Sequence, residues 1–165
     1  MPRILTLMRH GKSSWDYNLE DQYRPLKKRA YTDIFDVYSN FKDHLSDSTS
    51  YITSPAVRAQ TTAKEFLKLA GVSEHKLIIE SNLYTFDPIV LQNLILSLDD
   101  SNSNQMLFGH NPAFTAVANH YGSMFFDNIP TSGLVRIRFE ADAWKDISNG
   151  ITQVHLFPKD LRQCK

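Results

Sequence analysis

The sequence predicts an α/β fold, a three-layer sandwich in which helices flank a mostly parallel, mixed sheet. Short apolar runs suited to buried strands alternate along the chain with stretches whose apolar residues recur at helical spacing. The 165 residues, of which 42% are hydrophobic, are enough for one core. Because no repeat or linker divides the chain, we expect a single domain over residues 1–165.

The first part of the chain repeats a strand and then a helix. We expect strands at 4–8, 51–53, 77–79 and 105–108. The apolar spacing predicts the helices that follow them, at about 30–45, 59–70, 90–98 and 114–121. This alternation favours parallel strands with helices on both faces of the sheet.

The last part of the chain has a different pattern. Residues 134–139 alternate strictly, with Val135, Ile137 and Phe139 on one face and arginines on the other, which indicates a half-exposed strand near an edge. Val154 and Leu156 indicate a closing strand. We expect these two strands to pair like a hairpin, so the sheet is mixed.

Three of the predicted helices begin with a capping residue followed by proline: Ser54-Pro55, Asp87-Pro88 and Asn111-Pro112. In an open α/β sheet such helix starts gather at the carboxyl edge of the strands, where anionic ligands commonly bind. Capping alone also explains each pair.

The charge balance excludes some classes of partner. Lys+Arg and Asp+Glu are 18 each, so we expect no non-specific binding to nucleic acid or to an anionic membrane. No apolar run is long enough for a signal peptide or a membrane span, and we expect a cytoplasmic protein. The single cysteine, Cys164, offers neither a disulfide framework nor a cysteine-ligated metal.

The charges are unevenly distributed along the chain. Residues 1–30 hold seven cations and three anions, and the cluster Lys27–Arg29 is interpreted as a solvated helix face. Residues 77–135 contain no Lys or Arg, so a cation from that stretch must be a histidine.

Phosphate-binding residue types follow three of the predicted strands. Arg9 and His10 come directly after the first, Arg58 lies in the first turn of the helix after the second, and His110 follows the fourth. Because these three corners share one edge of the sheet, we expect the four side chains to converge on one tetrahedral anion. The run 11–13 mimics the end of a nucleotide-binding loop, but Thr6 stands where that loop needs its first glycine, which excludes it.

Several motifs together resemble the histidine phosphatase superfamily, also called phosphoglycerate mutase-like, and within it the short SixA-type phosphohistidine phosphatases. The resemblance covers nearly the whole chain. It is carried, in order, by Arg9-His10-Gly11, Lys12-Ser13-Ser14-Trp15-Asp16, Arg24-Pro25-Leu26, Ser54-Pro55-Ala56 with Arg58, Gly109-His110-Asn111-Pro112 and Ile129-Pro130-Thr131.

The resemblance implies a metal-independent phosphatase without a cofactor. His10 would be the nucleophile that forms a covalent phosphohistidine, Arg9 and Arg58 would clamp the phosphoryl oxygens, and His110 would give a further donor. Four residues are implied as secondary substrate contacts: Gly11, Lys12, Ser13 and Asn111.

The chain departs from its larger relatives in the proton donor. Relatives that cleave phosphomonoesters carry an acid after the third strand, whereas here Glu80, Asp87 and Asp16 are only candidates, Asp87 being better explained as a helix cap. A missing acid favours phosphohistidine, whose leaving group departs easily. Ala30 stands where relatives often have glycine, and we expect it to affect only the start of its helix.

Two other functions stay open. The first is a phosphatase for a small phosphomonoester or phosphoanhydride, and the second is a non-catalytic phospho-binding module. The expected partner is a phosphorylated protein or a small phosphorylated molecule, and the oligomeric state is left open.

Overall fold

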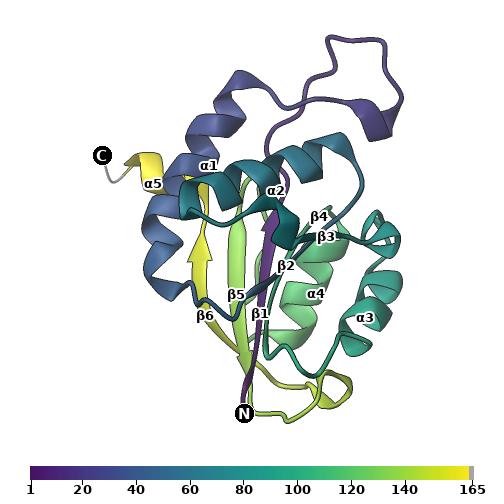
Figure 1. Cartoon of the computed structure of the whole chain (residues 1–165), viewed down its shortest axis with the longest axis vertical. Coiled ribbons are helices and arrows are strands. Elements are labelled where there is room, and N and C mark those ends of the chain that lie inside the picture. The colour runs from purple at the N-terminus through teal and green to yellow at the C-terminus, as the bar shows by residue number, and fades with distance from the viewer. Residues whose placement is uncertain (164–165) are drawn as a thin grey trace.

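The computed structural model describes residues 1–163, and it has the predicted three layers, with helices on both faces of one sheet (Figure 1). The strands are β1 (Arg3–Arg9), β2 (Ser50–Thr53), β3 (Leu77–Ile79), β4 (Asn104–Gly109), β5 (Leu134–Phe139) and β6 (Ile151–Leu156). The helices are α1 (Lys28–Phe41), α2 (Val57–Ala70), α3 (Pro88–Leu96), α4 (Ala113–Tyr121) and α5 (Pro158–Gln163).

The sheet is mixed, as predicted. Its six strands lie in the order β3-β2-β4-β1-β5-β6. The pairs β2–β3, β2–β4 and β1–β4 are parallel, whereas β5 is antiparallel to both β1 and β6. The strands β1, β2 and β4 therefore end at the same edge of the sheet, which we call the carboxyl edge.

The two faces of the sheet carry separate cores. On one face α1 and α2 pack against the sheet, and their core includes Ile34, Phe66 and Phe108. On the other face α3 and α4 pack, with Phe114 and Trp144 in the core. Figure 1 shows these helices on opposite sides of the central strands. Helices bury apolar stripes on both faces, which explains why the parallel strands read as continuous apolar runs.

The predicted elements are confirmed, with small shifts at their ends. Helix α1 ends at Phe41, and a short 3-10 turn over Lys42–His44 follows where the sequence pattern continued the helix to 45. Helix α2 ends at Ala70 and is capped by Gly71, whose φ of 70° is a left-handed conformation that glycine adopts without strain. The short helix α5 had no periodic signal in the sequence.

The predicted helix starts are right in one case of three. Asp87 caps α3 by accepting a hydrogen bond from the Ile89 amide, with Pro88 in the first turn. Helix α2 begins two residues beyond Pro55, at Val57. Pro112 itself occupies the cap position of α4, and the Asn111 side chain accepts a hydrogen bond from the Thr115 amide.

The described residues contain no helix that is both long and apolar enough to cross a bilayer. Cys164 lies outside the described residues.

Candidate active site

The structure brings Arg9, His10, Arg58 and His110 together at the carboxyl edge. Arg9 ends β1 and His10 follows it, Arg58 is in the first turn of α2, and His110 follows β4 directly. His10, Arg58 and His110 are buried, with 7%, 2% and 1% of their surface exposed. The convergence expected from the three strand ends is therefore present.

The guanidinium group of Arg58 joins the two histidines. Its Nε donates to Nε2 of His10 at 3.3 Å, and its Nη2 lies 3.5 Å from Nδ1 of His110. The centroids of the two imidazole rings are 5.3 Å apart. One edge of the guanidinium therefore faces both rings, in the bidentate geometry that suits phosphoryl oxygens.

His10 is held as a neutral imidazole whose Nε2 carries no proton. Its Nδ1 donates to the carbonyl oxygen of Gly11 at 2.7 Å, which leaves Nε2 as the unprotonated nitrogen. Burial, with the nearby His110, Arg58 and Arg9, lowers the pKa of His10 to about 3. An unprotonated Nε2 is the form that a nucleophile needs.

His110 is also neutral, which corrects the expectation that it supplies a cation. Burial, reinforced by Arg58, lowers its pKa to about 3. Because Arg58 can only donate, Nδ1 of His110 accepts and Nε2 donates to the Ser54 hydroxyl at 2.8 Å. A phosphoryl dianion bound beside Nδ1 would raise this pKa, because a nearby negative charge favours the protonated form.

Arg9, at the end of β1 next to His10, has an uncommitted donor. Its Nη1 donates to the carbonyl of Ile129 at 2.9 Å, whereas its Nε is buried without a partner. An unpaired buried donor costs free energy unless a ligand satisfies it.

Asp21 is the residue of the site that the sequence analysis missed. Its backbone carbonyl accepts from Nη1 of Arg58 at 2.7 Å, and its carboxylate accepts from Nη2 at 2.9 Å. Nε and Nη2 of Arg24 also donate to this carboxylate, both at 3.2 Å, and so does the Tyr84 hydroxyl. Although partial burial opposes it, hydrogen bonds from Tyr84 and Arg58 lower the pKa of Asp21 to about 2.

Asp21 therefore holds one edge of the Arg58 guanidinium while the other edge faces the histidines. Because Asp21 is ionised at neutral pH, it is a fixed acceptor and has no proton to donate. The only sequence signal near it was the Arg24-Pro25-Leu26 motif, and nothing in the sequence linked Asp21 to a residue 37 positions away.

The three proton-donor candidates do not join this cluster. Glu80 and Asp87 accept from the backbone amides of Asn82 and Ile89, as caps of their own helical turns. Asp16 is exposed, and its backbone amide bonds the Ser14 hydroxyl. Within residues 1–163, no hydrogen bond or ion pair links any of them to His10 or Arg58.

The four secondary candidates have different surroundings. Gly11 lies next to His10, and its amide donates to the Thr62 hydroxyl at 2.9 Å. The Ser13 hydroxyl accepts from Arg24, and the side chain of Asn111 is engaged with neighbouring loops and α4. Lys12 is exposed and lines a different hollow. In the described part of the chain, no hydrogen bond or ion pair joins Lys12, Ser13 or the Asn111 side chain to the four central residues.

Ala30 has a role beyond the helix start that was expected for it. A Cβ atom built on Gly11 lies 2.7 Å from the Cβ of Ala30, too close for two carbon atoms. Because Gly11 has no Cβ atom, α1 can pack closely against the turn that carries His10, and Ala30 is the residue of α1 at this contact.

Two aromatic rings form a wall beside His110. The Tyr84 and Phe86 ring centroids lie 5.1 and 5.5 Å from that of His110. Phe86 is 48% exposed, so this wall reaches the surface.

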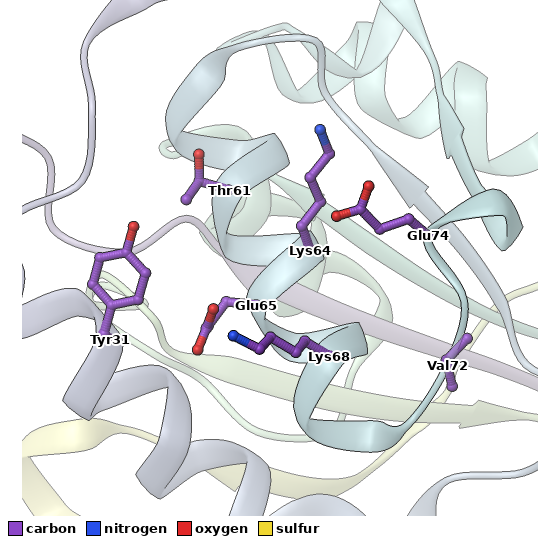
Figure 2. Close-up of a pocket in the computed structure, with 7 residues that line it drawn as sticks. All are labelled: Tyr31, Thr61, Lys64, Glu65, Lys68, Val72 and Glu74. Atoms are coloured by element: carbon purple, nitrogen blue, oxygen red, sulfur yellow. The ribbon is translucent and has the colours of Figure 1, made fainter.

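A hollow of about 360 Å³ lies elsewhere, on the outer face of α2 beside Tyr31 of α1 (Figure 2). It contains none of the residues above, and its charged residues, Lys64, Lys68, Glu65 and Glu74, balance. Among residues 1–163, no three His, Cys, Asp or Glu side chains are grouped as metal ligands are.

Solved structures of phosphatases share this fold. A Nakamurella multipartitia protein assigned as phosphohistidine phosphatase SixA aligns with a TM-score of 0.77 at 18% identity, over 96% of this chain and 97% of its own. The protein histidine phosphatase SixA complexed with tungstate aligns with a TM-score of 0.77 at 16% identity, over 96% and 99% of the two chains.

A mycobacterial glucosyl-3-phosphoglycerate phosphatase aligns with a TM-score of 0.66 at 12% identity, over 93% of this chain and 98% of its own. No family model matches the sequence, and neither does any curated protein. The likeness is therefore one of fold, and it confirms the predicted phosphoglycerate mutase-like architecture.

Proposed function

We propose that the protein is a histidine phosphatase of the SixA type that hydrolyses phosphohistidine through a covalent intermediate on His10. The observation that carries the proposal is a buried, neutral His10 whose Nε2 faces the guanidinium of Arg58, with His110 at the same edge of that group. A neutral nucleophile beside a bidentate cation is what phosphoryl transfer requires.

In the first step Nε2 of His10 attacks phosphorus and forms a nitrogen–phosphorus bond. The bond from phosphorus to the substrate imidazole breaks, its electron pair stays on that imidazole, and the imidazole takes a proton from solvent. Nε of Arg58 donates to Nε2 of His10, and when the substrate binds this N–H turns from Nε2 to a phosphoryl oxygen, which frees the lone pair for attack. Arg9 adds its unpaired Nε.

In the second step a water molecule attacks phosphorus, and the bond to Nε2 of His10 breaks. Inorganic phosphate leaves, and His10 regains the neutral form that the hydrogen bond to Gly11 favours. Arg58 and Arg9 stabilise the charge on the equatorial oxygens in both steps.

The ionised state of Asp21, the carboxylate next to Arg58, supports phosphohistidine as the substrate. Asp21 is the carboxylate bonded to Arg58, and its pKa of about 2 keeps it ionised. An alkoxide leaving group needs a proton from the enzyme, whereas the imidazole of a phosphohistidine departs without one. The SixA protein of the same fold that forms a complex with tungstate, an oxyanion, agrees with an anion site in this architecture.

A small phosphomonoester is the second candidate substrate. The exposed wall of Tyr84 and Phe86 beside His110 could pack against an organic leaving group. One neighbour in fold is named as a glucosyl-3-phosphoglycerate phosphatase.

A substrate panel tests the proposal. Purified protein is assayed for phosphate release from a phosphohistidine peptide, a sugar phosphate and a nucleotide, with His10→Ala as the matched inactive variant. We expect the highest kcat/KM for the phosphohistidine peptide and no turnover by His10→Ala. Faster turnover of the sugar phosphate or the nucleotide would favour the second candidate.

A further inference from the structure

A hollow lined mainly by cations lies beside the candidate active site. It has a volume of about 160 Å³ and lies between the start of α1, the loop before β5 and α5. We call it the basic hollow, and its lining consists of Lys12, Arg29, Asp33, Pro130, Thr131, Pro158, Lys159 and Arg162. It therefore gathers four cations and one carboxylate in a chain of zero net charge.

The single carboxylate of the hollow is already paired. Asp33 is 4% exposed, and its carboxylate lies 2.7 Å from Nη1 of Arg162 and 3.9 Å from Nε of Arg29. Within the described part of the chain, no acid lies at ion-pair distance from the side chains of Lys12 and Lys159, and both are exposed. The hollow thus keeps an excess of positive charge that internal ion pairs do not cancel.

The backbone ties the basic hollow to the nucleophile. Lys12 follows the turn of His10 and Gly11. The opposite wall, Pro130 and Thr131, belongs to a loop in which the Ser132 amide donates to the His10 carbonyl at 3.0 Å. The distance between hollow and nucleophile is therefore fixed by the fold, which a substrate contact requires.

The size and the donors of the hollow indicate what it binds. Small-molecule sites usually span about 300–1,000 Å³, so this hollow suits one side chain rather than a whole ligand. Its uncommitted cations are lysines, which act as solvated point charges and attract a carboxylate without fixed bidentate geometry.

We propose that the basic hollow receives an acidic side chain of the phosphorylated protein while its phosphoryl group lies at His10. The inference rests on the proposed function, because it names a feature of that protein substrate. It also gives a role to part of the cationic amino-terminal segment, of which Lys12 and Arg29 line the hollow.

Two matched peptides test the inference. Each carries one phosphohistidine, flanked by glutamates in the first peptide and by glutamines in the second. We expect the wild type to have a KM about twofold to fivefold lower for the glutamate peptide, because an exposed charge pair contributes up to about 1 kcal/mol. Salt at about 0.5 M should reduce this preference, because it screens exposed charges.

The variants are Lys159→Glu and, as its control, Lys145→Glu. Lys145 is exposed in the turn after β5, at the opposite edge of the sheet, and its substitution makes the same change in net charge. We expect Lys159→Glu to abolish the preference for the glutamate peptide and Lys145→Glu to keep it. Turnover of phosphoramidate, which has no carboxylate, should stay within about twofold of wild type in both.

Three results would overturn the inference. They are equal KM values for the two peptides in the wild type, an equal loss of the glutamate preference in both variants, or a loss of phosphoramidate turnover in Lys159→Glu as large as its loss of turnover with the glutamate peptide. If neither peptide is hydrolysed but a small phosphoester is, the proposed function fails instead. Equilibrium binding of the two labelled peptides to wild type and Lys159→Glu then still decides whether the hollow prefers acidic chains.

Discussion

Replacing Asp21 with asparagine removes the charge that positions Arg58 and leaves the shape of the side chain nearly unchanged. The Asp21 carboxylate lies 2.9 Å from Nη2 of Arg58, and its backbone carbonyl lies 2.7 Å from Nη1. The backbone contact survives the substitution, so Arg58 keeps one of its two anchors.

The expected loss follows from the charged hydrogen bond. Such bonds contribute about 1.5–3 kcal/mol, and because the Asp21 side chain is 42% exposed, water reduces the effect to the low end. About 1.5 kcal/mol corresponds to roughly tenfold in rate. The loss should appear in kcat rather than KM, because the alignment of Arg58 matters most when charge develops on the phosphoryl oxygens.

The assay is steady-state turnover of phosphoramidate, together with inhibition by inorganic phosphate. Asp16→Asn is the control, because Asp16 lies on the same loop, is exposed and does not contact Arg58. It should stay within about twofold of wild type. Faster turnover by Asp21→Asn, or tighter phosphate binding with kcat unchanged, would show that Asp21 competes with the substrate and would refute its positioning role.

Three other substitutions or titrations give equally definite outcomes. Gly11→Ala should lower the free energy of unfolding by about 1–3 kcal/mol, seen as a lower denaturation midpoint, and Ala30→Gly in the same chain should restore most of that free energy. An unchanged midpoint for Gly11→Ala would contradict the close approach of Gly11 and Ala30. Arg58→Lys should lower kcat at least about tenfold, because lysine cannot face two oxygens at once, and wild-type kinetics would exclude a bidentate role. In NMR titrations His10 and His110 should stay neutral from about pH 8 to 5, and phosphate should raise the pKa of His110; a midpoint near pH 6.5 in the free protein would contradict their burial.

The two buried histidines also predict how stability depends on pH. Their folded pKa values of about 3 lie below the unfolded value of 6.5, so the unfolded chain binds more protons between these limits. Stability should therefore fall as the pH decreases from about 6.5 towards 3. Chemical denaturation at several pH values checks this, and His10→Asn should make the decline shallower.

The sequence was sufficient for the parts of the fold and site that follow from periodicity and strand ends. The apolar patterns predicted β1 to β6 and the helices α1 to α4. The residues at the strand-to-helix corners predicted that His10, Arg58 and His110 would come together. These predictions succeed because parallel strands bring their carboxyl ends to one edge.

Features that depend on loops and on burial could not be predicted. Asp21 lies in a segment without periodicity, and only the fold brings it to Arg58. The sequence favoured a charged His110, whereas burial beside Arg58 makes it neutral. The start of α2 was misplaced by two residues: the helix begins at Val57, and the Ser54 hydroxyl accepts from the Ala56 amide and also bonds His110.

In the proposed mechanism Nε2 of His10 carries the phosphoryl group. The direct measurement is to mix the protein with phosphoramidate, quench it rapidly and locate the phosphate by mass spectrometry and phosphorus NMR. Because Nδ1 of His10 is bonded to Gly11, we expect phosphohistidine at residue 10, substituted on Nε2, and none in His10→Ala. Turnover without label on His10, or label that persists in His10→Ala, would contradict this mechanism.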